Sequence, residues 1–268
     1  MITSPLPMRI ALFSLLFSLF AIGAIAQNNT GEIVYVDKVN IHKSLPPEME
    51  AMKDRIPEFR ESKKILYFNA AEALYINKPR DEADRQQQQE FRGEGRGRRG
   101  GGRFGGRNND NKYYTNFAEG SAVDSRNFFG KDFLIEGSRE SLKWKITGEQ
   151  KQVGSYLCQK ATFQDTSQSI EVWFTPMIPV SSGPDDYFGL PGMILHMDFD
   201  SGTRQITATD ISLKALAEEQ IIRQTKGKKV TRDEFTEIRD EKIKEMEEEF
   251  GGRPGGGGRF GRFRSGGW

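Results

Sequence analysis

The residues best suited to chemistry are four soft metal ligands, Cys158, Met193, His196 and Met197. Thiolate, imidazole and thioether groups together suit Cu(I). On a β-strand, His196 and Met197 would point to opposite faces, whereas Met193 and Met197 would share one face. Two interpretations stay open: a copper site built from these four residues, or a methionine-rich apolar core that also buries the single cysteine.

Motifs of hydrolases and nucleotide-binding enzymes do not occur in the sequence. The two histidines, His42 and His196, lie on different expected strands, and there is no G-x-S-x-G, H-E-x-x-H, P-loop or C-x-x-C spacing. Asp185 and Asp186 are adjacent carboxylates, but their position in a proline-rich loop is explained by turn preference. We therefore expect no enzymatic activity and assign no catalytic residue.

The N-terminal segment 1–26 has the pattern of a secretory signal. It carries one charge, Arg9, then an apolar run from residue 10 to 20, and ends in Ala24-Ile25-Ala26. We expect cleavage near Ala26 and a mature chain, without a transmembrane span, that is periplasmic or associated with the outer membrane. The 39 basic and 38 acidic side chains give no overall attraction to a polyanion.

The segments that must position any site are mostly short apolar runs. From residue 112 onward such runs recur about every ten residues and are separated by turn residues, which is typical of consecutive antiparallel strands. Ile170, Val172 and Phe174 alternate with Trp173, which should face the other way. Leu142–Ile146 alternates in the same manner. The predicted fold is mainly β, a curved antiparallel sheet in the form of a half-barrel or β-meander.

A C-terminal amphipathic helix is expected over about residues 232–250. Thr231 is a good N-cap and Glu234 completes a capping box. Phe235 and Ile238 fall on one side of the helical wheel. This helix is a candidate cover for the apolar face of the sheet.

Two arginine- and glycine-rich tracts, 92–107 and 251–268, are expected to be disordered. They contain six and four arginines but too few apolar residues to offset chain entropy. Such tracts bind single-stranded nucleic acid in other settings. Because an exported protein meets little RNA, we expect no nucleic-acid partner, and interpret the tracts as a tolerated loop insertion and a flexible tail.

The loop between the strands that end at Thr175 and begin at Met193 is stiffened by four prolines. Pro191 presets the backbone for a turn, and Gly192 can adopt the positive φ that a type II turn needs next. Rigid loops on sheets often serve recognition. The loop is equally compatible with a hydrophobic plug that closes the end of the sheet.

The segment Gly189-Leu190-Pro191-Gly192-Met193-Ile194 resembles the signature of the GLPGLI family, with Met193 in place of the usual leucine. The resemblance continues through Gly154–Ala161 and Val172–Thr175. It implies an exported protein of the cell envelope of a Gram-negative organism, found mainly in Bacteroidetes, with one strand-rich domain over residues 27–250. It implies no activity, because none is established for the family.

Together these features predict a non-enzymatic, monomeric envelope protein. It would bind a lipid-like ligand, or an outer-membrane or periplasmic partner, through the concave face of the sheet and the proline-rich loop. The alternative is a periplasmic copper-handling protein that uses Cys158, His196 and the methionines. The expected binding residues are Trp173, Pro179, Gly183, Pro184, Gly189, Leu190, Pro191, Gly192 and Met193.

Overall fold

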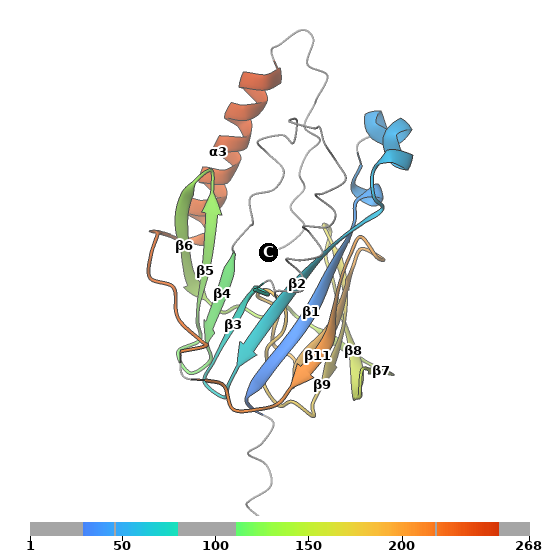
Figure 1. Ribbon diagram of the computed structural model, residues 1–268, viewed down its shortest axis with the longest axis vertical. Coiled ribbons are helices and arrows are strands. Elements are labelled where there is room, and N and C mark those ends of the chain that lie inside the picture. The colour runs from blue at the N-terminus through green and yellow to red at the C-terminus, as the bar shows by residue number, and fades with distance from the viewer. Residues whose placement is uncertain (1–28, 46, 80–110, 218, 252–268) are drawn as a thin grey trace, which may run out of the picture.

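The computed structural model describes residues 29–45, 47–79, 111–217 and 219–251 (Figure 1). The predicted signal segment 1–26, the tract 92–107 and all but the first residue of the tract 251–268 lie outside these ranges. Within them, no helix combines the length and apolar character needed to cross a membrane. The elements are β1 (Gly31–Asn40), η1 (His42–Ser44), η2 (Pro47–Arg55), β2 (Phe59–Phe68), β3 (Glu72–Asn77), β4 (Lys112–Asn116), β5 (Ser121–Phe128), β6 (Lys131–Ser138), β7 (Lys145–Val153), β8 (Tyr156–Gln164), β9 (Ser169–Thr175), β10 (Met193–Phe199), β11 (Arg204–Ser212), β12 (Lys228–Val230) and α3 (Arg232–Gly251).

The strands form one open sheet of twelve in the order β12-β6-β5-β4-β3-β2-β1-β11-β10-β9-β8-β7. Figure 1 shows the sheet curving, with β4 to β6 on one side, β7 to β9 on the other, and β1, β2 and β11 between them. Neighbouring strands are antiparallel, except that β12 pairs in parallel with β6. The mainly-β prediction is confirmed, whereas the parallel β12 was not expected.

Burial alternates along β1 and along the first part of β9, and this alternation marks the side that meets the core. In β9, Ile170 and Val172 are fully buried in the core, and Trp173, which pairs with Lys160 of β8, is also buried, with 6% of its surface exposed. The prediction of a strand over Leu142–Ile146 is wrong for its first part, since β7 begins only at Lys145. The Trp144 indole Nε1–H donates to the Phe188 carbonyl at 2.7 Å. The alternation there therefore reflects packing against the proline-rich loop.

The proline-rich loop 176–192 fills the concave face of the sheet. Ile178, Val180, Tyr187 and Leu190 are buried in the main hydrophobic core, which also contains side chains of β1, β2, β3, β8, β9, β10 and β11. Gly183 lies so close to Ile194 of β10 that an added Cβ would come within 2.8 Å of the isoleucine Cβ. Of the two interpretations left open for this loop, the structure matches the hydrophobic plug.

The helix α3 lies at one end of the sheet, beside β5 and β6 (Figure 1). Its capping box is formed as predicted: Glu234 N–H donates to Thr231 Oγ1 at 3.2 Å, and Thr231 N–H donates to Glu234 Oε2 at 2.7 Å. Phe235 packs edge-on against Phe133 of β6. The helix thus covers only this end, and the proline-rich loop covers the central strands.

Candidate functional site

The tip of the proline-rich loop carries Asp185 and Asp186 into a set of ion pairs on the concave face. Asp185 Oδ2 accepts from Arg204 Nη2 of β11 at 2.8 Å. The same guanidinium donates to both oxygens of Asp37 in β1, at 2.9 Å from Nε and 2.8 Å from Nη2. One arginine therefore ties the loop tip to two central strands.

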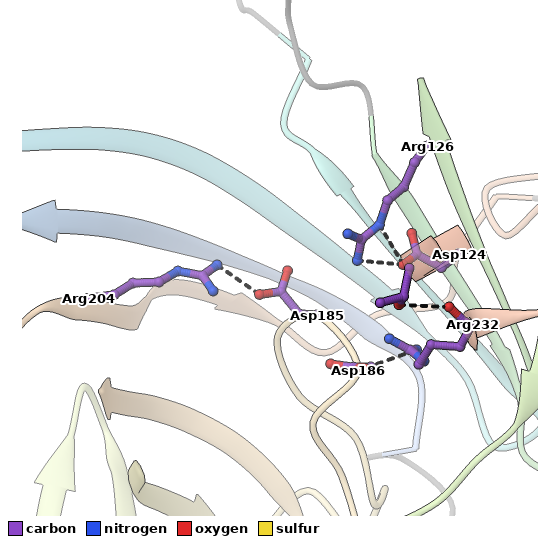
Figure 2. Close-up of polar contacts among 7 residues, drawn as sticks. Asp124, Arg126, Asp185, Asp186, Arg204 and Arg232 are labelled. Carbon is purple, nitrogen blue, oxygen red and sulfur yellow. Dashed lines mark hydrogen bonds and ion pairs between the residues drawn. The ribbon is translucent and has the colours of Figure 1, made fainter. Parts of the chain in front are cut away.

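Asp186 points the other way, toward α3 (Figure 2). Its Oδ2 lies 3.3 Å from Arg232 Nη2, on the first residue of that helix. On β5, Asp124 Oδ2 accepts from Arg126 at 2.7 Å from Nε and 2.6 Å from Nη2. We call this group the loop-tip cluster; its members are Asp37, Asp124, Arg126, Asp185, Asp186, Arg204 and Arg232.

The backbone at the loop tip is strained. Asp185 has a φ of 51°, in the left-handed region that few residues with a Cβ adopt, although aspartate enters it more readily than most. Such strain costs about 1–3 kcal/mol and persists where the surroundings fix the conformation. Here the two ion pairs of Arg204 and the close packing at Gly183 supply that constraint.

Burial and neighbouring charges set the pKa values of the cluster in different proportions. Burial raises the pKa of Asp186 to about 7; Arg232 opposes this shift, while the neighbouring Asp185 and Asp124 add to it. Burial alone would lower the pKa of Arg204, but its carboxylate partners outweigh burial and hold that pKa above its ordinary value. Asp186 therefore changes charge near neutral pH, whereas Arg204 stays charged.

Two tyrosine hydroxyls near the cluster are buried without a hydrogen-bond partner among the described residues, those of Tyr75 and Tyr187. Burial raises the pKa of both phenols, and the charge of Asp185 raises each further. Buried polar atoms are normally paired with protein or water. The cluster thus has polar atoms that an additional polar group can satisfy.

The expected binding residues do not form one surface. Gly183, Pro184, Leu190, Gly192 and Met193 are buried within the loop and the start of β10, while Pro179, Gly189 and Pro191 are exposed. Trp173 lies with Lys151 and Lys160, whose Nζ atoms are 4.4 and 5.8 Å from its ring centroid.

The sequence analysis did not predict the loop-tip cluster. Asp185 and Asp186 have an ordinary turn composition, and their partners come from distant segments of the chain.

The four residues of the copper hypothesis are distributed through the sheet. Met193 and Met197 are fully buried in the core, and the buried Cys158 Sγ lies 3.7 Å from the Tyr156 carbonyl oxygen. His196 Nδ1 lies 2.8 Å from Thr207 Oγ1, with its pKa lowered by burial and by Lys151. Because adjacent strand residues point to opposite faces, His196 and Met197 do not converge. Over the described part of the chain, no group of three His, Cys, Asp or Glu residues has metal-site geometry.

Comparison with known proteins gives a family match and a fold match. A family model described as a protein of unknown function (Porph_ging), associated with Bacteroidetes, matches residues 164–196, which include β9 and the proline-rich loop. Two solved structures of PNGF-II, in space groups P21 and C2, are each 15% identical, with TM-scores of 0.52 and 0.51. The similarity covers 78% of this chain and 33% and 32% of those chains, so this chain spans about a third of their length. No curated protein matches the sequence. At this identity the likeness shows a shared β-rich fold alone.

Proposed function

We propose that the mature chain is a non-enzymatic, exported envelope protein that binds a polar partner at its concave face. The contact region is the loop-tip cluster, where the proline-rich loop meets β5 and α3. The observation that carries the proposal is the pair Asp185 and Asp186, which combines a strained backbone with a desolvated carboxyl. Strain and displaced pKa values concentrate at functional sites, because folding stability alone does not favour them.

A polar partner is better supported than a lipid-like ligand. The apolar side chains of the loop, such as Ile178 and Leu190, are packed into the core and occupy the space that a hydrophobic ligand would need. The groups that retain contact with solvent at the loop tip are ionic: Asp185 and Arg232 keep 33% and 42% of their side-chain surface. An outer-membrane or periplasmic protein can present complementary charges to such a surface.

The composition of the cluster supports a binding role. Its seven members are four aspartates and three arginines, and two of the aspartates share Arg204, so one negative charge is left over when all are ionised. A hydrolytic site would need a nucleophile and a base in mutual contact. Export rests on the signal pattern of residues 1–26, and the matching family model carries no activity.

Native mass spectrometry of the protein purified from the envelope of its own host tests the proposal. We expect the wild-type chain to begin near residue 27 and to retain a partner that Arg232→Gln loses. The control is Lys244→Gln, on the same helix but with 78% of its side chain exposed, which should keep the partner. Wild-type protein without any bound species, or equal retention by both variants, would contradict binding at the cluster. Recovery from the cytosol with residues 1–26 attached would contradict export.

A further inference from the structure

Arg139 lies just after β6, beside the proline-rich loop, and is held there by three contacts. Its Nη2 donates to the Ser181 carbonyl oxygen at 3.2 Å. Its Cζ lies 3.5 Å from the ring centroid of Phe188 and 5.0 Å from that of Phe117. Stacking on aromatic rings orients a guanidinium without neutralising its charge. The side chain is therefore positioned in advance by the loop and by the segment after β4.

No carboxylate of the described residues pairs with Arg139. In the described ranges, no acidic oxygen lies within 4.0 Å of it, whereas Arg126, Arg204 and Arg232 each pair with an aspartate. Burial lowers its pKa to about 10, opposed only by Tyr113 and Asp186. Asp186 is a weak counter-charge, because it is paired with Arg232 and its own pKa is about 7.

The guanidinium also has unused donors. Its Nε is buried without an acceptor. Nη1 has no acceptor among the described residues either, and it is not among the fully buried unpaired atoms. Each terminal nitrogen of arginine carries two hydrogens, and Ser181 engages one of those on Nη2. Nη1 and the remaining hydrogen of Nη2 are thus the unused donors of the guanidinium fork.

We infer that Arg139 is a recognition site for a carboxylate group. A carboxylate is planar and accepts two parallel hydrogen bonds from such a fork, and its single charge matches the single uncompensated charge. A phosphate dianion fits less well, because the charge of Asp186 acts on Arg139 and would repel a second negative charge there. The inference rests on the proposed binding function and gives its ligand chemistry. The carboxylate can belong to a protein partner or to a free carboxylic acid.

Acetate is the probe that tests this chemistry. In the mature chain labelled with ¹⁵N-arginine, the Nε–Hε signal of each arginine is followed by NMR during titration with sodium acetate, at ionic strength held constant with sodium chloride. We expect the Arg139 signal to shift saturably at millimolar acetate, while the signal of Arg204, already held by two aspartates, stays fixed. No saturable shift, an equal response to chloride, or tighter binding of phosphate than of acetate would overturn the assignment.

Two substitutions make the test specific. Arg139→Lys keeps the charge but removes the fork, so we expect the apparent acetate affinity, followed by backbone amide signals, to fall at least tenfold. Arg223→Lys is the matched control, since Arg223 is 44% exposed and pairs with surface glutamates; its affinity should equal that of wild type. An Arg139→Lys variant that folds, as its amide spectrum reports, and binds acetate as well as wild type would refute the inference.

Envelope-purified protein separates this inference from the proposed function. If wild type and Arg139→Lys retain the same partner equally, the proposed function stands and carboxylate recognition by Arg139 fails. If acetate binds Arg139 saturably but no partner is retained, the proposed function fails and the chemistry of Arg139 stands. A low-mass adduct lost on Arg139→Lys identifies a free acid as the source, and a lost polypeptide identifies a protein carboxylate.

Discussion

Replacing Asp186 by asparagine should remove a pH dependence from the stability of the fold. The pKa of this carboxyl is raised from its ordinary 3.8 to about 7, chiefly by burial. A group with a raised pKa holds its proton more tightly in the folded chain than in the unfolded one, so the folded state loses stability as pH rises from about 4 to about 7. Above pH 7 the ionised carboxyl remains as a net cost.

The size of the expected stability difference follows from the shift in the pKa of Asp186. About three pKa units correspond to roughly 4 kcal/mol, and the 19% exposure of the Asp186 side chain reduces the expected value to about 2–4 kcal/mol. Asparagine keeps an oxygen that can accept from Arg232 but never ionises. Asp186→Asn should therefore match wild type within about 1 kcal/mol near pH 4 and exceed it by about 2 kcal/mol or more at pH 8.

Urea denaturation followed by tryptophan fluorescence from pH 4.5 to 8.5 measures this difference. Asp165→Asn is the control, because Asp165 is exposed and its pKa is lowered by hydrogen bonds from Ser167 and Gln168. A lowered pKa costs stability only as pH falls below the ordinary value, so this variant should parallel wild type across the range. A difference between Asp186→Asn and wild type that stays constant with pH would refute the assigned ionisation.

Three further substitutions test the packing around the cluster, each by the midpoint of urea denaturation. Arg204→Ala should destabilise the fold by about 3–5 kcal/mol, because it leaves Asp37, 9% exposed, buried without a partner; an effect below about 1 kcal/mol would argue against this ion pair. Gly192→Ala should lower the free energy of unfolding by about 2 kcal/mol or more, because Gly192 has a φ of 149° and an added Cβ would clash with the backbone of β9. The control Gly148→Ala, where a Cβ would meet open space, should change this free energy by no more than about 0.5 kcal/mol. Thr231→Ala removes the N-cap of α3 and should lower the free energy of unfolding by about 1 kcal/mol. An unchanged free energy of unfolding would mean that α3 contributes little to global stability.

Local features of the fold could be predicted from the sequence because their causes are local. The capping box needs only Thr231 and Glu234, three residues apart, and both bonds form. Alternation in Ile170 and Val172 follows from the two-residue period of a strand, and both are buried. Alternation alone did not distinguish a strand from a segment such as Leu142–Trp144, whose apolar residues pack against a loop.

The site could not be predicted because its partners are remote in sequence. Asp186 and Arg232 are 46 residues apart, and Arg204 and Asp37 are 167 apart. Adjacent aspartates between prolines have the same composition in a solvated turn as in a buried ion pair, so only the fold distinguishes the two. The strand β12 was missed for a related reason: Lys228–Val230 is three residues long, and its place is set by pairing with β6.

The two aspartates at the loop tip connect the central strands of the sheet with the helix at its end. Asp185 holds the loop to β1 and β11 through Arg204, and Asp186 holds it to α3 through Arg232. Arg139 lies in the same electrostatic neighbourhood, because the charge of Asp186 raises its pKa. A carboxylate bound at Arg139 would add a negative charge near Asp186 and favour its protonated form. Since linkage is reciprocal, protonation of Asp186 would in turn favour carboxylate binding, so that the partner and a proton are taken up together near neutral pH.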